Sequence, residues 1–190
     1  MKGVIFFDID TQYDFMHRNG KFYVQGAEDI IPNLGAITKF AAANNVPVFA
    51  SIDNNGFKKE DGGWSQLKIP ETRLENAAIV PNKRLTNEKI KELKKEDKLL
   101  IEKQEHNAFS NPNLKLILNG AKKAYVYGVA TDFCVKEVVL ELRNMKVETY
   151  VVKDAIKPVS KINESRDLAL FKNKGAKFLT TQQLLRKKEL

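Results

Sequence analysis

The sequence is poor in the side chains that build disulfides and metal centres, with one cysteine and two histidines among 190 residues. A single cysteine excludes an internal disulfide and is typical of a reducing compartment, so we expect a cytoplasmic protein. No apolar run approaches the ~20 residues that a membrane helix needs. We also expect no signal peptide, because Met1 and Lys2 lead into an apolar stretch that soon meets Asp8 and Asp10.

Positive charge is in excess, with 32 Lys and Arg against 24 Asp and Glu and a formal net charge of +8. Such a charge is compatible with nucleic-acid binding, which needs a basic stripe interleaved with aromatic residues. The lysines are instead scattered over predicted helix faces and loops, and the dense patch at residues 91–98 also contains acids. We therefore expect a solvated lysine-rich surface, with neither a nucleic-acid partner nor a membrane partner.

Strand and helix patterns alternate along the whole chain, which predicts one domain over residues 1–190. Its expected fold is a three-layer α/β/α sandwich around a six-stranded, mostly parallel open sheet. The predicted strands cover residues 3–9, 46–52, 99–101, 124–127, 147–153 and 177–180. The predicted helices cover residues 30–41, 86–95, 113–119, 135–143, 163–174 and 181–187. Residues 54–85 show no periodicity and are predicted to form a long functional loop.

The single cysteine, Cys134, lies where a predicted strand has ended and a predicted helix begins. A thiol at this place faces unpaired backbone N–H groups and the positive end of the helix dipole, which favour the thiolate. The same N–H groups can hold a developing oxyanion. A lone cysteine is more often a small buried hydrophobic residue. The position of Cys134 predicts a nucleophile with a lowered pKa instead.

A base and a cation for this nucleophile are found at the ends of two other predicted strands. The first strand runs into Asp10, and the strand at residues 99–101 is followed by Lys103. In an open parallel α/β sheet, ligands bind beyond the carboxyl ends of the strands. We therefore expect Asp10, Lys103 and Cys134 to meet at that edge, where a carboxylate takes the thiol proton and a lysine holds the thiolate.

Three sequence blocks resemble the isochorismatase-like cysteine hydrolases, a family that includes nicotinamidases, N-carbamoylsarcosine amidases and isochorismatases. Residues 10–15 (DTQYDF) are similar to the motif D-x-Q-x-D-F, and residues 128–134 (GVATDFC) match G-V-A-T-D-x-C. Between them, Lys103 is followed by Ala108-Phe109 in place of the usual S-A-F. The ordered blocks span nearly the whole chain.

The resemblance implies a catalytic triad, with Cys134 as the nucleophile, Asp10 as the proton acceptor and later donor, and Lys103 as electrostatic support. It also implies a cis peptide bond between Val129 and Ala130. The backbone N–H groups of Ala130 and Cys134 would then form the oxyanion hole.

One departure from the family concerns the metal that its nicotinamidases hold with one aspartate and three histidines. Asp53 occupies the aspartate position, but Asn55 stands where the next ligand is expected, and the region of the other two contains no histidine. A carboxylate and an amide oxygen match zinc or iron poorly. We therefore expect no metal and no cofactor, which makes nicotinamide a less favoured substrate.

Other residues near the predicted site are candidates for substrate binding. Hydrogen-bonding groups are available from Asp53, Asn55 and His106. Phe15, Trp64 and Phe109 are candidates to contact a planar substrate. For each of them, packing in the ordinary hydrophobic core is the alternative. We expect a homo-oligomer, a dimer or tetramer, that cleaves the C–N bond of a small-molecule amide or ureide through a thioester.

Four alternatives stay open at this point. The first is hydrolysis of a vinyl ether, as in isochorismatase, which need not use a covalent cysteine. The second is a nicotinamidase, if a metal is bound after all. The third is a magnesium-dependent phosphatase-like domain, since Asp8 and Asp10 form a D-x-D pattern whose oxygens suit magnesium. The fourth is a family member that no longer catalyses.

Overall fold

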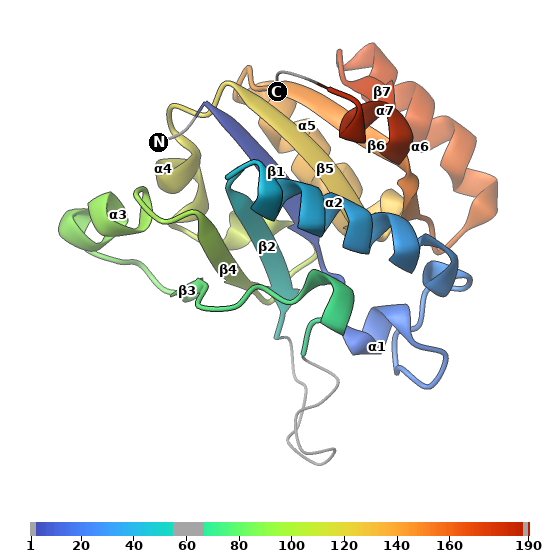
Figure 1. The fold of residues 1–190 in the computed structure, drawn as a ribbon, viewed down its shortest axis with the longest axis horizontal. Coiled ribbons are helices and arrows are strands. Elements are labelled where there is room, and N and C mark those ends of the chain that lie inside the picture. Colours follow the sequence, from blue (N-terminus) through green and yellow to red (C-terminus); the bar gives the residue numbers. More distant parts are fainter. Residues whose placement is uncertain (1–2, 55–66, 188–189) are drawn as a thin grey trace.

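The computed structural model describes residues 3–54, 67–187 and 190 of the chain (Figure 1). Its centre is a seven-stranded sheet with the order β3-β4-β2-β1-β5-β6-β7. Every pair of neighbouring strands in this sheet is parallel. The strands are β1 (Val4–Ile9), β2 (Val48–Asp53), β3 (Ala78–Val80), β4 (Lys98–Lys103), β5 (Lys123–Val129), β6 (Glu148–Lys157) and β7 (Lys177–Leu179).

The prediction of six strands was wrong by one, because β3 lies in the stretch that was expected to be a loop. β3 has three residues and pairs only with β4, at the edge of the sheet. A strand this short cannot show the alternation of polar and apolar residues by which strands are recognised. Its conformation depends on β4, with which residues from Ala78 to Val80 pair in parallel.

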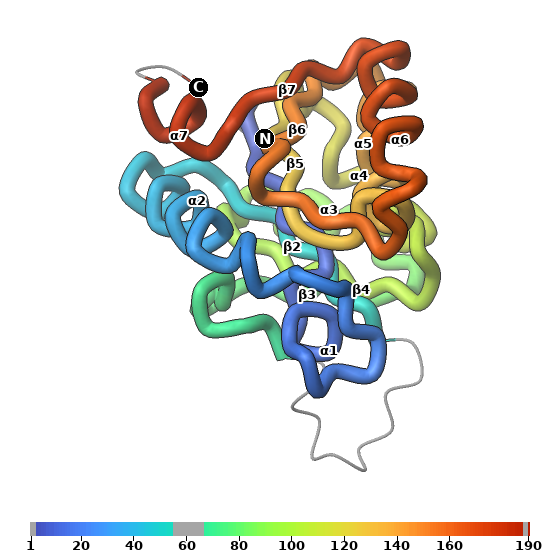
Figure 2. The backbone as a smooth tube through the Cα atoms, turned by 90° about the vertical axis from the view of Figure 1, so that its right-hand side faces the viewer, coloured from blue at the N-terminus to red at the C-terminus, as the bar shows by residue number. Residues whose placement is uncertain are grey.

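Helices cover both faces of the sheet (Figure 2). They are α1 (Tyr13–Met16), α2 (Ile31–Ala43), α3 (Asn87–Leu93), α4 (Leu114–Leu118), α5 (Lys136–Asn144), α6 (Lys161–Asn173) and α7 (Thr181–Leu185). One buried cluster joins the sheet to α3, α4, α5 and α6, and the other joins it to α2 and α7. Figure 2 shows α2 and α7 on one side of the strands and α5 and α6 on the other. These are the three layers that the alternating pattern predicts.

The two faces are built from alternate residues of each strand, since successive side chains of a strand point to opposite sides. In β1, Ile5 and Phe7 join the cluster under α4 and α5, whereas Phe6 joins the cluster under α2. All three side chains are fully buried. The continuous apolar run of β1 therefore reflects a strand that is covered on both faces.

The strand order creates a switch point beside β1. The chain leaves β1 for β2 on one side, and later places β5 on its other side, with Ile9 opposite Gly128. Parallel α/β sheets bind ligands in the crevice outside the carboxyl ends of the strands at such a point. Among the residues that the structure describes, no helix is long and apolar enough to cross a membrane.

Candidate active site

Three side chains from separate strand ends meet at this switch point. Asp10 follows β1, Lys103 is the last residue of β4, and Cys134 lies in a π-helical turn, Thr131–Val135, directly after β5. The Lys103 Nζ atom is 3.0 Å from Asp10 Oδ2 and 3.7 Å from Cys134 Sγ. The structure thus brings together the three residues that sequence reasoning selected.

Lys103 is the centre of this cluster and is fully buried. Its ammonium group also lies 3.1 Å from Asp53 Oδ2 and donates a 3.0 Å hydrogen bond to the Glu105 carbonyl oxygen. Burial disfavours the charged form, but Asp10, Cys134 and Asp53 together outweigh burial and raise the pKa of Lys103. Lys103 is therefore a permanent cation within the site.

The Cys134 thiol differs from what its place at a helix start predicts. Cys134 is only 6% exposed. Burial, together with the charge of Asp10, raises the pKa of the Cys134 thiol well above its ordinary value, although the charge of Lys103 lowers it. The expected lowering of this pKa was therefore wrong. The sequence shows the helix start, but only the fold shows that the thiol is desolvated and lies beside a carboxylate.

Asp10 has a backbone φ of 48°, which is uncommon for a residue other than glycine. Its Oδ2 atom is held by Lys103, and its Oδ1 atom accepts a 2.7 Å hydrogen bond from the Ser51 hydroxyl group. Sequence reasoning missed Ser51. The available signal was a serine that interrupts the apolar part of β2 before Asp53, where Ser51 lies opposite Ile9 of β1.

The end of β5, just before the turn that carries Cys134, packs tightly against the backbone of β1. Gly128 has a φ of +114°, and a Cβ atom there would lie 2.1 Å from the Ile9 carbonyl oxygen. Only glycine fits a position with both constraints. The peptide bond between Val129 and Ala130 is cis, as the family resemblance implies.

Two polar residues of the sequence motifs hold the surroundings of the site in place. The Asp132 carboxylate accepts hydrogen bonds of 2.9 and 3.0 Å from the backbone N–H groups of Val159 and Ser160, which tie the cysteine turn to the end of β6. The Gln12 side chain donates to the Asp53 carbonyl oxygen at 2.9 Å and accepts from its N–H group at 2.7 Å. Sequence reasoning quoted both residues in motifs but assigned them no role.

Asp8 does not share the environment of Asp10. Its carboxylate is fully buried, forms a 2.9 Å ion pair with Lys68 and accepts a 2.8 Å hydrogen bond from Thr11. Burial raises the pKa of Asp8 above its usual value, although Lys68 acts against this shift. The two carboxylates of the D-x-D pattern therefore have different cationic partners, Lys68 and Lys103, rather than one shared cation.

Asp10 and Cys134 line a cavity of about 480 Å³. Asp10, Asp53 and Cys134 supply its polar end, and most of the remaining wall is apolar or aromatic. The described residues that line it are Asp10, Phe15, Lys21, Phe22, Tyr23, Val24, Asp53, His106, Val129, Ala130, Phe133, Cys134 and Val159. A volume of this size suits a small molecule.

The candidate substrate-binding residues have three different outcomes. Phe15, Asp53 and His106 line the cavity, the last with its ring centroid 5.2 Å from that of Phe133. Phe109 does not line it, because the turn Ala108–Ser110 directs its ring against the buried cluster under α4 and α5. Asn55 and Trp64 lie outside the described residues.

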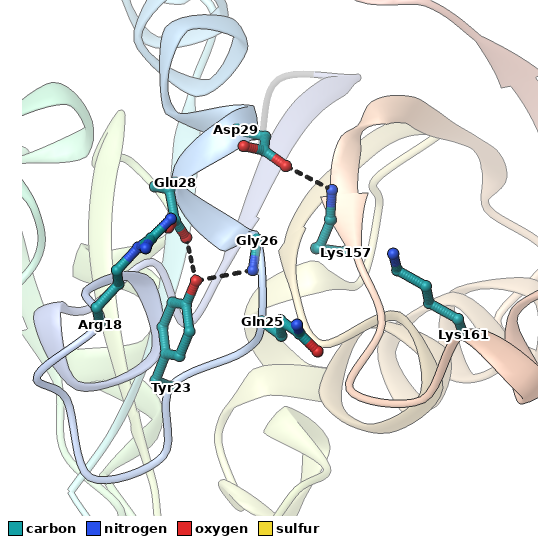
Figure 3. A pocket seen from close by; sticks show the side chains of 8 residues that line it. All are labelled: Arg18, Tyr23, Gln25, Gly26, Glu28, Asp29, Lys157 and Lys161. Carbon is teal, nitrogen blue, oxygen red and sulfur yellow. Dashed lines mark hydrogen bonds and ion pairs between the residues drawn. The ribbon is translucent and has the colours of Figure 1, made fainter.

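A second cavity of about 400 Å³ adjoins the first, and Tyr23 lines both (Figure 3). The Tyr23 hydroxyl group donates a hydrogen bond to Glu28 and accepts one of 2.8 Å from the Gly26 N–H group. Figure 3 also shows the 3.1 Å ion pair between Lys157 and Asp29. Tyr23 is therefore a fixed wall between the two cavities.

The isochorismatase domain model matches residues 4–183, so the chain belongs to the isochorismatase family. An isochorismatase-like hydrolase from Alkaliphilus metalliredigens shares the fold with a TM-score of 0.77 at 18% identity, over 99% of this chain and 100% of its own. A pyrazinamidase from Pyrococcus horikoshii, solved in complex with zinc, has a TM-score of 0.68 at 25% identity, over 94% of this chain and 99% of its own. N-carbamoylsarcosine amidase from Thermoplasma acidophilum has a TM-score of 0.73 at 16% identity, over 100% of this chain and 99% of its own. No curated protein matches the sequence.

The residues around Asp53 do not fit a transition-metal site. Its carboxylate is paired with Lys103, a cation that would repel a metal ion at the same oxygen. Across residues 3–54, 67–187 and 190, no group of three or more His, Cys, Asp or Glu side chains is arranged to hold a metal ion. Structural and catalytic zinc sites take three or four protein ligands. We therefore derive the chemistry without a metal.

Proposed function

We propose that this protein is a cysteine hydrolase that cleaves the C–N bond of a small amide or ureide. The observation that carries the proposal is the position of the Lys103 ammonium group, 3.0 Å from Asp10 and 3.7 Å from Cys134, beside a cavity of small-molecule size. Membership of the isochorismatase family supports a hydrolase, and its structural relatives include a pyrazinamidase and an N-carbamoylsarcosine amidase.

In the first step, Cys134 Sγ attacks the carbonyl carbon of the substrate while Asp10 accepts the thiol proton. A resting thiol with a raised pKa requires this coupling, because the free thiolate is scarce near neutral pH. The carbonyl oxygen becomes an oxyanion, which we assign to the backbone N–H groups of Ala130 and Cys134. Lys103 offsets the negative charge that develops on the sulfur as its proton leaves and that lies on the oxyanion once the C–S bond has formed.

The tetrahedral intermediate then collapses. The C–N bond breaks, Asp10 gives its proton to the leaving nitrogen, and the acyl group stays on Cys134 as a thioester. In the second half-reaction, water attacks the thioester while Asp10 accepts one proton from it. The C–S bond breaks, the proton returns to sulfur, and a carboxylic acid, or a carbamic acid from a ureide, is released.

Turnover of a panel of primary amides, carbamoyl compounds and isochorismate tests this proposal. We expect an amide or ureide to be hydrolysed by the wild type and not by Cys134→Ala, and a mass increase on Cys134 equal to the acyl group after rapid quenching. Hydrolysis of isochorismate that persists in Cys134→Ala would support vinyl-ether chemistry instead. Magnesium-dependent hydrolysis of a phosphate ester would support the phosphatase-like alternative.

A further inference from the structure

A second lysine, Lys21, lines the catalytic cavity and has no part in the chemistry proposed above. It is exposed, and its Nζ atom lies 5.3 Å from the centroid of the Phe22 ring, a cation–π contact. Across the described parts of the chain, ion pairs are found for Arg18 and Lys157 nearby, but none for Lys21. Among the described residues, the ammonium group of this lysine at the cavity mouth therefore forms no ion pair.

The loop that carries Lys21 is anchored to α1 rather than free. The Lys21 backbone N–H group donates a hydrogen bond to the Asp14 carboxylate, and the Phe22 N–H group donates one of 3.2 Å to the Asp14 carbonyl oxygen. The Phe15 and Phe22 rings stack with centroids 6.1 Å apart. These contacts hold the start of the Lys21 side chain at the cavity.

The inner end of the cavity has the opposite character. Two carboxylates, Asp10 and Asp53, share the single ammonium group of Lys103. The formal charge of this group is therefore negative by one unit. An anionic group on the substrate is repelled by this inner end and attracted to Lys21 at the mouth. The charges therefore orient a substrate with its anionic group at Lys21 and its neutral amide at Cys134.

Between the two ends the wall is apolar and largely aromatic, with Phe15, Phe22, Val24, Phe133 and Val159. We infer that the substrate is an amide that carries an anionic group, such as a carboxylate, on the far side of an apolar spacer. Lys21 binds that anion. The inference deepens the proposed function and rests on it for the position of the scissile amide.

Binding to the Cys134→Ala protein, followed by calorimetry or ligand-observed NMR, tests the anion site without turnover. The probes are benzamide and its meta- and para-carboxylated forms, which share the ring and the amide. We expect one carboxylated form to bind ~5-fold tighter than benzamide, the effect of one partly exposed ion pair. Lys21→Gln should abolish this preference, and Lys21→Glu should reverse it toward para-(aminomethyl)benzamide.

Lys161→Gln is the matched control, because it removes the same charge from the adjoining cavity (Figure 3). It should leave the preference intact. The inference is overturned if the tighter binding of the carboxylated form survives Lys21→Gln, or if it disappears equally in Lys161→Gln. It is also overturned if no carboxylated amide binds at millimolar concentration. Failure of the proposed function is seen separately, as absence of Cys134-dependent amide hydrolysis by the wild type in the turnover panel.

Discussion

The Lys103 ammonium group lies 3.7 Å from Cys134 Sγ, and yet burial and the Asp10 carboxylate raise the pKa of that thiol well above its ordinary value. The thiol is therefore harder to ionise than a free cysteine, despite the cation beside it. This arrangement suits a nucleophile whose proton leaves only when a substrate carbonyl is in place. It also changes what a labelling experiment should show.

Alkylation of Cys134 by iodoacetamide should rise with pH and inflect above ~8.5, the value of a free cysteine. Asp10→Asn should move the inflection to lower pH, because it removes a charge that raises the pKa of the thiol. Lys103→Met should move it to higher pH. The chain has one cysteine, so bound label reports this site alone. An inflection below ~8.5 in the wild type would contradict the raised pKa.

Asp10→Asn should reduce kcat/KM for the best amide by ~10²–10⁴-fold, since positioned proton transfer contributes about that much. Asp8→Asn is the matched control, because Asp8 lies two residues away and is paired with Lys68. It should lower stability while the folded protein retains activity. The opposite pattern, with Asp10→Asn active and Asp8→Asn inactive, would favour the phosphatase-like alternative.

Lys68→Met should lower the free energy of unfolding at neutral pH by about 3–5 kcal/mol, the usual effect of leaving a buried charge unpaired. The cause is Asp8, whose pKa burial already raises and whose ionised form then lacks its cation. The loss should shrink as the pH falls through the pKa of Asp8, because a protonated carboxyl needs no partner. Urea unfolding of both proteins from neutral to acidic pH measures it, and a pH-independent difference would contradict this cause.

Gly128→Ala should destabilise the protein by about 3 kcal/mol or more, the sum of a left-handed backbone penalty and a steric clash. Gly120→Ala is its control, since Gly120 also has a positive φ, +105°, but a Cβ atom there would meet nothing within 4 Å. That substitution should cost only about 1–2 kcal/mol. Equal losses in thermal or urea unfolding would show that the contact with Ile9 is unimportant.

Purified, tag-free protein should contain zinc, iron and manganese at well below one ion per chain, and chelation should leave activity unchanged. The reason is the pairing of Asp53 with Lys103 and the lack of a histidine at position 55. Elemental analysis before and after chelator treatment measures both. A stoichiometric metal whose removal abolishes turnover would support the nicotinamidase alternative.

Much of the site was predictable from local sequence. Asp10, Lys103 and Cys134 each follow or end an apolar strand, and parallel strands place their carboxyl ends at one edge, so a common edge needs no knowledge of strand order. Their meeting at one point depends on the order, which places β4, β2, β1 and β5 side by side. The same reasoning could not find Ser51 or explain Gln12 and Asp132. Their partners are 27 to 41 residues away in the chain, at positions set by the pairing of strands and loops.

The sequence alone determined the layers of the fold and the choice of the three residues proposed as a triad, because strand and helix periodicity and motif spacing are local properties of the chain. The tertiary structure decided β3, the direction of the thiol pKa and the position of Phe109. β3 depends on its neighbour β4, the pKa depends on burial and on a carboxylate 124 residues earlier in the chain, and the position of Phe109 depends on the buried cluster against which its ring packs. Each of these follows from contacts between distant segments, which form only when the sheet assembles.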